Sequence, residues 1–574
     1  MRLVPSRRWL LSLSAAMALL GLLAAAALAA DGDPDPSFDL DGRAVVDLTP
    51  FDDEAADVAI DSAGRLLVVG SSDPVGMPPE RALIARFLSS GELDKTFSGD
   101  GFDLIPWPTE GSSGANAVTI DSAGRIVVAG DVFAKTGFDY AAARYQPSGE
   151  LDKSFSEDGL LTLDVPGAGL DIARAVAVDG QDRVVLAGQA VTPGVPSVSH
   201  MGIVRFTASG APDAGFDTEG SLLVDFPGRT DAQASSVAID AAGRIVVGGG
   251  AGTSAGPEEF ALARLLDGGG LDPGFGSGGR ATLDFGTLPN EELEDLTLDG
   301  SGRIVVAGLA GPFFGTVVDV GRLLANGGPD PSFGGGDGTT TTAPQGRATA
   351  RAVAVDRAGR VLVAGTAGTS FGEAAALFRY TPAGEPDQSF GEAGLVRTDF
   401  LAANGVGGGV AIDAEGRYVL AGTAEAANGA RAIGLARFIT SYPSGEVSPP
   451  PPSPPSPAPL IPAPPRCGGA AATIVGGPGK DRVRGTGGRD VVATLGGDDT
   501  VRSLGGNDLV CAGAGKDLVV GGGGADRVLG EGGADRLLGG PGRDKLLGQG
   551  GADKLLGGPG KDALTGGPGK DVQR

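Results

Sequence analysis

Residues 118–130 read VTIDSAGRIVVAG, a stretch that recurs along most of the chain. Apolar residues alternate up to Asp121, D-S-A-G supplies turn chemistry, and Ile126–Ala129 are apolar without a break. This pattern predicts a β-hairpin whose second strand is buried. The shared element, I/V-D-x-x-x-R-x-x-V/L-x-G, has its aspartate at Asp61, Asp121, Asp179, Asp240, Asp299, Asp356 and Asp413.

Two further elements recur with the same spacing of 57 to 61 residues. A D-x-x-F element ends at Phe38, Phe97, Phe155, Phe216, Phe275, Phe333 and Phe390. An apolar strand carries an arginine at Arg86, Arg144, Arg205, Arg264, Arg322, Arg379 and Arg437. Four short strands in each of seven repeats, without helical periodicity, predict an all-β fold with a seven-bladed β-propeller. An open β-solenoid is the alternative.

The two ends of this repeat region are out of register with each other. The last repeat ends at Arg437-Phe438, whereas the first D-x-x-F lies at 35–38. A ring could therefore close by pairing N-terminal residues with the last blade, which would leave no exposed sheet edge. The combined pattern resembles the delta-60 repeat of secreted bacterial proteins over about 31–440. That resemblance implies architecture and export, because the family has no common activity.

The repeated polar residues are expected to be structural. An aspartate before x-x-Gly caps its own turn, and an arginine in every repeat is expected to pair with a carboxylate of a neighbouring blade. A binding site should instead break the symmetry, as the 191–201 insertion and the acidic stretch Glu291–Asp295 do. His200 is the only histidine, which disfavours a Ser-His-Asp triad or a histidine-ligated zinc site.

The last hundred residues contain an aspartate at every ninth position. These are Asp481, Asp490, Asp499, Asp508, Asp517, Asp526, Asp535, Asp544, Asp553, Asp562 and Asp571. An apolar residue follows two positions later, from Val483 to Leu564, and a glycine precedes two positions earlier. The pattern predicts stacked coils with rows of carboxylates, which suit a hard divalent cation, most plausibly calcium.

The unit GGPGKDRVR (476–484) resembles the RTX, or haemolysin-type, calcium-binding nonapeptide. The resemblance covers 476–574 and implies a parallel β-roll with two nonapeptides in each coil. Aspartates 18 residues apart would then face each other, with Ca²⁺ bound between turns and backbone carbonyls completing its ligands. The implied metal-site glycines are Gly479, Gly488, Gly497, Gly506, Gly515, Gly524, Gly533, Gly542, Gly551 and Gly560.

Several departures from the nonapeptide pattern are visible. Thr494, Ser503 and Ala512 replace its first glycine, and Lys or Arg often stands beside the aspartate, which would weaken calcium binding. Cys467 and Cys511 form an even pair, which suggests a disulfide in an oxidising compartment. Their separation by two coils, about 10 Å, means that Cys467 must fold back over the first coil. A roll without bound metal is the alternative.

The remaining segments indicate export and domain separation. Residues 1–30 have a basic start, an apolar stretch and an A-x-A site, as in a cleaved signal peptide. Residues 443–466 are Pro-rich and predict an extended linker between a propeller at 31–442 and a roll at 467–574. A net charge of −26 argues against nucleic acid as a partner, and no membrane span is expected after cleavage.

Together these patterns predict a secreted or cell-surface bacterial protein that binds calcium and is not an enzyme. A cell-surface, carbohydrate or protein ligand is expected for the propeller, as in an adhesin or lectin. The competing hypothesis is a propeller hydrolase or lactonase with an accessory calcium-binding tail. Its signature would be a divalent ion held by carboxylates of the central channel.

Overall fold

The computed structural model describes residues 30–440 and 466–573, apart from short gaps. The gaps are 74–78, 109–110, 135–136, 195–196, 218, 254–257, 287–290, 312–315, 345, 370–371, 401–403, 426–428, 469 and 477–478. The predicted signal peptide and nearly all of the predicted linker lie outside the described residues. The chain divides into two compact units, Met1–Pro451 and Pro452–Arg574.

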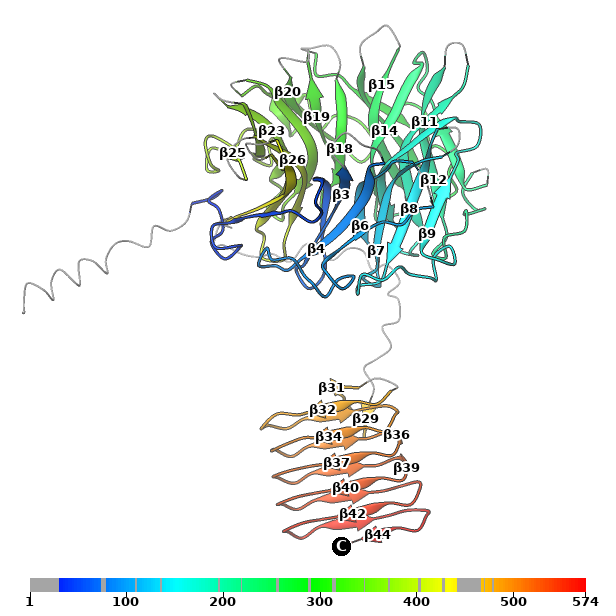
Figure 1. Cartoon of the computed structure of the whole chain (residues 1–574), viewed down its shortest axis with the longest axis vertical. Helices are drawn as coiled ribbons and strands as arrows, with labels where there is room; N and C mark the ends of the chain where they lie inside the picture. The colour runs from blue at the N-terminus through cyan, green and yellow to red at the C-terminus, as the bar shows by residue number, and fades with distance from the viewer. Residues whose placement is uncertain are drawn as a thin grey trace, which may run out of the picture. The chain divides into compact units, whose positions relative to one another are not determined.

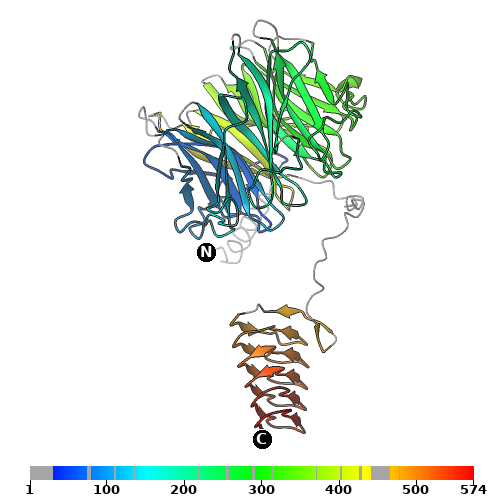
Figure 2. The ribbon, with the colours of Figure 1, turned by 90° about the vertical axis from the view of Figure 1, so that its right-hand side faces the viewer.

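The N-terminal unit is built from antiparallel sheets (Figures 1 and 2). Five of them have four strands and one has eight. One four-stranded sheet contains β2 (Asp52–Ile60), β3 (Leu66–Asp73), β4 (Arg81–Phe87) and β5 (Phe102–Leu104). The next contains β6 (Ser113–Ile120), β7 (Ile126–Phe133), β8 (Phe138–Tyr145) and β9 (Leu160–Leu163).

The eight-stranded sheet contains two successive sets of four strands, joined by a single parallel bridge between Ser199 and Asp231. The first set is β10 (Leu170–Val178), β11 (Val184–Thr192), β12 (Val198–Phe206) and β13 (Ser221–Val224). The second set is β14 (Asp231–Ile239), β15 (Ile245–Gly252), β16 (Glu259–Leu265) and β17 (Arg280–Leu283).

Three further four-stranded sheets complete this unit. The first contains β18 (Glu292–Leu298), β19 (Ile304–Ala310), β20 (Val317–Leu323) and β21 (Thr339–Thr342). The second contains β22 (Ala348–Val355), β23 (Val361–Thr369), β24 (Gly372–Tyr380) and β25 (Leu395–Thr398). The third contains β26 (Asn404–Ile412), β27 (Tyr418–Glu425) and β28 (Arg431–Phe438), together with β1 (Arg43–Val46). A short 3₁₀ turn, η1, covers Gly334–Gly336.

The sheets are arranged in a closed ring. The strands β2, β6, β10, β14, β18, β22 and β26 each contact the next one in this order, and β26 contacts β2. The N-terminal strand β1 pairs with β28, with Arg43 opposite Ala436, and so forms the outer edge of the last sheet. The unit is therefore a β-propeller, and the predicted closure by N-terminal residues is confirmed.

The repeated turn aspartate caps its hairpin as predicted. In the repeat with Asp121, Oδ1 accepts hydrogen bonds from the N–H groups of Ala123 and Arg125, both at 2.9 Å. Its Oδ2 accepts from Arg125 Nε at 2.6 Å. The same pairing of aspartate with the arginine four residues later occurs at all seven turns.

The arginine of each third strand is buried. Its main partner is a carboxylate of its own repeat and not of the neighbouring blade as predicted, although Arg205 also pairs with Asp267 of the next repeat at 3.0 Å. Arg144 Nε donates to Asp152 Oδ2 at 2.7 Å, and the guanidinium lies over Phe155, 4.7 Å from the ring centroid. Its carboxylate is thus the aspartate of its own D-x-x-F element, and only a carbonyl, Ala208 O, comes from the neighbouring repeat. The local pair is favoured because a short D-x-x-F turn returns its aspartate to the strand that precedes it.

The last of these arginines closes the ring. Arg437 Nε donates to Asp35 Oδ2 at 2.8 Å, and its guanidinium lies over Phe38. The D-x-x-F element near the N-terminus thus provides the carboxylate and the aromatic ring that contact the last arginine of the repeat region. Burying such a pair costs desolvation free energy, which the cation–π contact and the extra hydrogen bonds offset.

Two aspartates of the first strands join neighbouring sheets. Asp295 in β18 accepts hydrogen bonds from Ser236 Oγ at 2.6 Å and from the N–H of Val353 at 2.7 Å. Asp57 in β2 accepts from the N–H of Val118 at 2.9 Å. Burial raises the pKa of Asp295 to about 7 and that of Asp57 to about 6.

The C-terminal unit is a stack of very short parallel strands (Figures 1 and 2). One six-stranded sheet holds β31 (Ile474–Val475), β33 (Val491–Ala493), β35 (Leu509–Cys511), β38 (Arg527–Leu529), β41 (Lys545–Leu547) and β43 (Ala563–Thr565). The other holds β32 (Arg482–Arg484), β34 (Thr500–Arg502), β37 (Leu518–Val520), β40 (Arg536–Leu538), β42 (Lys554–Leu556) and β44 (Val572–Gln573). Two pairs flank them: β29 (Arg466–Cys467) with β30 (Ala470–Ala471), and β36 (Ala514–Gly515) with β39 (Gly532–Gly533).

The register of this stack is 18 residues, as predicted. Val501 pairs with Val519, and Val510 pairs with Val528. The apolar residue two positions after each aspartate points inward, so that residues of both sheets form one narrow core from Val492 to Leu555. The unit is a parallel β-solenoid with two nonapeptides in each coil.

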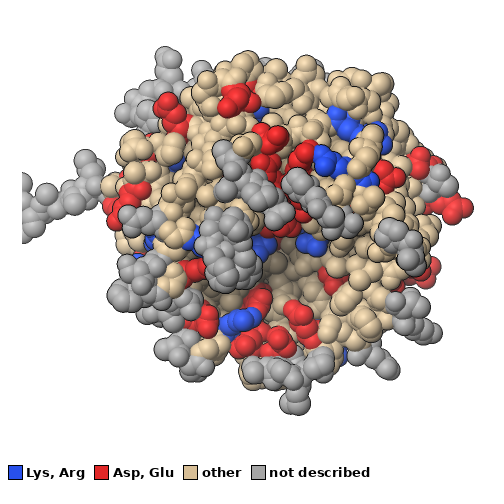
Figure 3. Space-filling view, turned by 90° about the horizontal axis from the view of Figure 1, so that it is seen from above, with Lys and Arg blue, Asp and Glu red and all other residues tan. Residues whose placement is uncertain are grey.

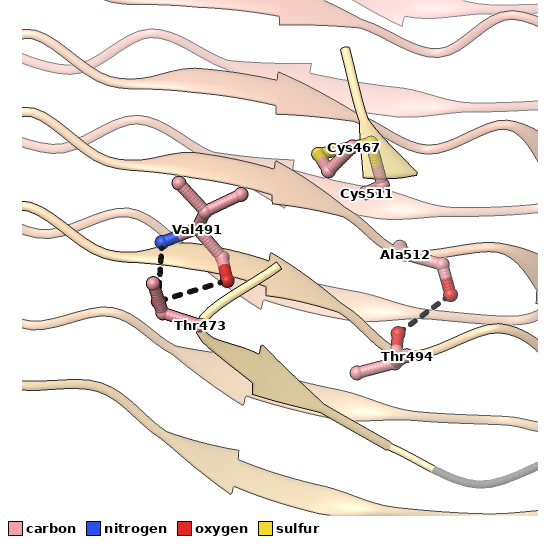
Figure 4. The surroundings of a disulfide bond; sticks show 6 residues. All are labelled: Cys467, Thr473, Val491, Thr494, Cys511 and Ala512. Atoms are coloured by element: carbon pink, nitrogen blue, oxygen red, sulfur yellow. Dashed lines mark hydrogen bonds between the residues drawn. A yellow bond between two sulfur atoms is a disulfide. The ribbon is translucent and has the colours of Figure 1, made fainter. Parts of the chain in front are cut away.

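The predicted disulfide is present at the start of the solenoid (Figure 4). The Cα atoms of Cys467 and Cys511 are 5.5 Å apart. This is possible because Cys467 lies in β29, outside the 18-residue register, and contacts β35 directly. Thr473 adds a second fastening, since its Oγ donates to Val491 O at 3.1 Å and accepts from Val491 N–H at 3.0 Å.

Four residues of the solenoid turns adopt a backbone conformation that favours glycine. Leu495, Leu504, Glu531 and Gln549 have φ between 65° and 77°, where other nonapeptides have glycine. At Gly551 the constraint is steric, because a Cβ there would lie 1.3 Å from the carbonyl oxygen of Gly533 in the preceding coil.

The first prediction concerns the pH dependence of the propeller. The folded-state pKa of Asp295 and Asp57 exceeds the unfolded value of about 3.8, so their contribution is fully present below that value and is lost as pH rises through 6 to 7. We expect the melting temperature of the propeller to rise by roughly 2 °C or more between pH 8 and pH 6. Fluorescence of buried Trp107 reports on this unit. Asp295→Asn should reduce the rise, and a variant that retains all of it would contradict the assignment.

The second prediction concerns the solenoid turns. Gln549→Gly should stabilise the solenoid by about 0.5–1 kcal/mol, because it relieves a left-handed residue at some cost in unfolded-state entropy. Gly551→Ala should disrupt the adjacent coils. Hydrogen exchange of tail peptides in saturating calcium measures both effects. Slower exchange in Gly551→Ala than in the parent chain would refute the steric argument.

Candidate metal centre

The aspartates of the solenoid form two ladders, one along each side of the stack. The backbone N–H of each aspartate donates to Oδ1 of the aspartate 18 residues later, at 2.8 to 3.0 Å. One ladder runs from Asp481 to Asp571 and the other from Asp490 to Asp562. The facing pairs that the sequence predicted are therefore in contact.

The second oxygen of most of these carboxylates is buried and has no hydrogen-bond partner. This holds for Oδ2 of Asp499, Asp508, Asp517, Asp526, Asp535, Asp544 and Asp553. Each of these seven residues is at most 3% exposed. A buried anionic oxygen without a partner costs several kcal/mol, and consecutive carboxylates in a ladder also repel each other. The ladders therefore need a proton or a cation at these oxygens.

The space beside four of the seven unpartnered oxygens is open because glycine begins the turn. A Cβ on Gly521 would lie 2.6 Å from Asp526 Oδ2 and 2.8 Å from the carbonyl oxygen of Gly539. The same two kinds of oxygen face the position of the missing Cβ at Gly530, Gly539 and Gly548. A carboxylate and a carbonyl oxygen around one small space are hard ligands of the kind that Ca²⁺ prefers.

Three early turns carry a side chain in place of this glycine. Thr494 Oγ1 donates to Ala512 O, and Ser503 Oγ donates to Gly521 O, both at 2.7 Å (Figure 4 shows the first). Ala512 fills the third position, and all three residues have no exposed surface. The hydroxyls thus bond to carbonyl oxygens that face open space in the later coils. Asp490 also differs, because Thr486 donates to its carboxylate.

The electrostatics of the ladders favour a bound cation. Burial, with a smaller contribution from the neighbouring aspartates, raises the pKa of Asp517 and of Asp535 to about 6. The pKa values of Asp526 and Asp544 are also raised, first by burial. Among the described residues, no Lys or Arg forms an ion pair with the seven aspartates that have a free Oδ2. The cations beside them, such as Arg527 and Lys545, are exposed and do not pair with these carboxylates.

The predicted metal-site glycines have a steric role in the structure. From Gly497 onward, a Cβ at these positions would lie within 2.6 Å of a carbonyl carbon or oxygen one coil earlier. Gly479 and Gly488 lie in the first coil and have no such neighbour within 3.7 Å. The glycines therefore permit the close stacking that places the carboxylates and carbonyls together.

In the propeller, the two asymmetric regions that the sequence singled out place His200 and Glu291 in local contacts. The His200 ring contacts Thr192 Oγ1 and Asp225. Glu291 accepts from the N–H of Phe285. One cluster that the sequence did not indicate comprises Asp139, Asp164 and Asp171, which offer carboxylate oxygens within 4.8 Å of one another. They come from β8, from the segment after β9 and from β10, so no local spacing could reveal them.

No helix among the described residues is long and apolar enough to cross a bilayer. No curated protein matches the chain. Two family models match parts of it. The RTX calcium-binding nonapeptide repeat matches 475–510, 512–546 and 538–572. The DUF5122 β-propeller, a domain of unknown function, matches 64–97, 124–155 and 243–275.

Solved structures share the propeller fold at low identity. A protein of unknown function from Dyadobacter fermentans is 12% identical, with a TM-score of 0.37, over 70% of this chain and 100% of that one. Virginiamycin B lyase from Staphylococcus aureus is 11% identical, with a TM-score of 0.40, over 69% and 98%. A gluconolactonase from Xanthomonas campestris is 15% identical, with a TM-score of 0.30, over 59% and 95%.

At these TM-scores the structural similarity says nothing about activity. The family matches agree with the geometry on both units. The ladder of buried carboxylates lies within the segments matched by the calcium-binding repeat. The Arg–Asp–Phe elements that end at Phe97, Phe155 and Phe275 lie within the segments matched by the propeller domain. The chain therefore carries a DUF5122 β-propeller followed by RTX calcium-binding nonapeptide repeats.

Proposed function

We propose that this chain is an exported, non-enzymatic protein in which calcium orders the C-terminal solenoid beside a ligand-binding propeller. The observation that carries the proposal is the row of buried Oδ2 atoms without partners. When bound, Ca²⁺ would supply the positive charge that these oxygens lack. The domain limits that follow are a signal peptide at 1–30, a propeller at 31–442, a linker at 443–466 and a solenoid at 467–574.

The propeller in this proposal has seven blades. The eight-stranded sheet then counts as two blades, because a single bridge, Ser199 to Asp231, joins its two sets of four strands. The closed ring of first strands supports this count, since β10 and β14 occupy successive places in it. Seven copies of each sequence element support it as well.

The calcium ligands are proposed to be the ladder aspartates together with carbonyl oxygens of the glycine-rich turns. The turns that contain Asp526, Asp535, Asp544 and Asp553 are the most complete, because each has glycine first and both oxygens facing the open space. Binding is weaker at Asp499, Asp508 and Asp517, where Thr494, Ser503 and Ala512 occupy that space. Since the ladders repel without a cation, calcium binding and folding of the solenoid are coupled.

Export is consistent with the disulfide and with calcium affinity. A disulfide such as Cys467–Cys511 persists in an oxidising compartment, and extracellular calcium is abundant enough to fill weak sites. We propose that the solenoid folds only after export, with the disulfide and Thr473 already holding its first coils. The propeller is proposed to bind a cell-surface, carbohydrate or protein ligand.

The third prediction tests the ladder directly. Asp535→Asn keeps an oxygen that can accept the N–H of Asp517 but removes one charge, so calcium affinity should fall about tenfold at the adjacent sites. The metal-free solenoid should become more stable in this variant, because the amide relieves repulsion. Calorimetric calcium titration and hydrogen exchange in chelator measure the two effects.

The matched control for this experiment is Glu531→Gln, which removes the same charge from an exposed residue of the same solenoid. It should leave calcium affinity nearly unchanged. Equal losses in the two variants would mean that calcium responds to net charge alone and that the buried oxygens are not ligands.

The fourth prediction concerns stoichiometry. Replacing Thr494 and Ser503 together by glycine should free two carbonyl oxygens and raise the number of tightly bound calcium ions by up to two. Equilibrium dialysis with metal analysis measures this number. Thr486→Gly serves as the comparison, because it opens a different position of the turn. An unchanged or smaller number in the Thr494/Ser503 variant would refute the role of these hydroxyls.

A further inference from the structure

The first strand of every sheet in the propeller ring contains one β-bulge, at the same place in each repeat. The pairing register shifts between Ala55 and Asp57 in β2, between Ala173 and Ala175 in β10, and at the equivalent place in the other strands. Each bulge leaves one residue unpaired. These residues are Ala56, Asn116, Arg174, Ser235, Glu294, Arg351 and Gly408.

All seven bulge residues line a single cavity of about 550 Å³. The cavity is enclosed by the ring of first strands, with further walls from Asp131 in β7 and from Thr423, Glu425 and Arg431 near the end of the ring. Figure 3 looks onto one face of the propeller, which is hollowed at its centre, and acidic and basic side chains gather around the hollow. Bulges frequently re-aim a side chain next to a binding site.

The bulge position is where the repeats stop resembling one another. The residue just before it is alanine in five repeats, leucine in one and glycine in one. At the bulge itself the side chains are alanine, asparagine, arginine, serine, glutamate, arginine and glycine. A purely structural role would call for one residue type, as the turn aspartate shows. The seven bulge positions therefore bring side chains of different charge and polarity together around one ring.

Most polar groups of this ring hold each other in place. Glu294 and Arg351 form an ion pair at 3.1 Å. Asn116 Nδ2 donates to Asp131 Oδ1 and to Ala173 O, both at 2.8 Å. Burial raises the pKa of Glu294 to about 7 and that of Asp131 to about 6. Asp131 is therefore mostly ionised at neutral pH, and both carboxyl groups can accept hydrogen bonds from hydroxyls.

Arg174 is the exception. Its guanidinium forms no ion pair or hydrogen bond with the described residues, and its Nε is buried without a partner. On the wall formed by Gly405–Gly408 and Ala55–Ala56 there is little side chain to fill the space. A Cβ on Gly408 would lie 2.7 Å from the carbonyl oxygen of Ala55. The cavity thus pairs one free cation with open volume and backbone carbonyls.

We infer that this cavity binds a hydrophilic carboxylate of sugar-acid size, with the carboxylate on Arg174 and the hydroxyls on Asn116, Asp131 and Glu294. A guanidinium binds a carboxylate through two parallel hydrogen bonds, and carboxyl and amide oxygens accept from hydroxyls. Among the described residues that line the cavity none is aromatic, which disfavours an apolar ligand. The volume lies within the usual range for small-molecule sites. This inference does not depend on calcium binding by the solenoid.

The test is a calorimetric titration of the full chain with D-glucuronate, compared with D-glucose and with acetate, at one saturating calcium concentration. Glucuronate should bind more tightly than either comparison compound, because only glucuronate carries both the carboxylate and the hydroxyls. Arg174→Gln should weaken its binding about tenfold, the usual loss for one charge-assisted interaction. The variant should fold, since Arg174 makes no hydrogen bond or ion pair with the described residues and acts on Asp131 and Glu294 only through longer-range attraction. Trp107 fluorescence checks this.

Two further variants keep the inference falsifiable. Ser235→Phe should abolish binding by filling the cavity, and Arg397→Gln, on the outer strand β25, should leave it unchanged. Repeating the titration with Asp535→Asn separates the two proposals, because a defective solenoid should not alter the propeller site. Absence of glucuronate binding, equal binding of glucose, or full binding by Arg174→Gln would overturn the inference.

Discussion

A buried carboxylate oxygen cannot remain charged and without a partner, and this constraint governs the whole C-terminal unit. The stacking of 18-residue coils places seven such oxygens in two rows, while glycine keeps the space beside most of them open. Their Oδ1 atoms are already used by backbone N–H groups, so only Oδ2 is available to a cation. The solenoid therefore needs a cation or a proton at these oxygens, and calcium is the cation that the proposed function assigns to them.

In the propeller, the buried arginines are neutralised by aspartates of the same unit. Each buried arginine is neutralised by the aspartate eight residues later in six repeats and by Asp35 in the last. The repeated Arg–Asp–Phe unit is the same in every repeat, whereas the bulge residues of the first strands differ from repeat to repeat around one cavity. Some of them, such as Glu294 and Arg351, also link neighbouring sheets.

Much of this architecture could be predicted from the sequence because it is periodic. The nine-residue spacing predicted the coils, the facing aspartates and the inward apolar residues, and the turn aspartates were predicted to cap their hairpins. The hydrogen-bond and ion-pair partners of individual side chains were harder to predict. The main arginine partner was wrong, because a sequence repeat cannot distinguish a carboxylate of its own blade from one of the neighbouring blade. The bulges leave no signal in spacing, and the bonds of Thr494 and Ser503 to carbonyls depend on the distance between coils.

We propose that the solenoid needs bound calcium to fold stably, whereas the propeller folds without calcium. Hydrogen exchange of the full chain, in saturating calcium and in chelator, tests this most directly. Peptides from 482–556 should exchange slowly with calcium and much faster without it, whereas propeller peptides around Phe155 and Arg437 should be protected equally in both conditions. Solenoid peptides that stay equally protected in chelator at neutral pH would contradict the account.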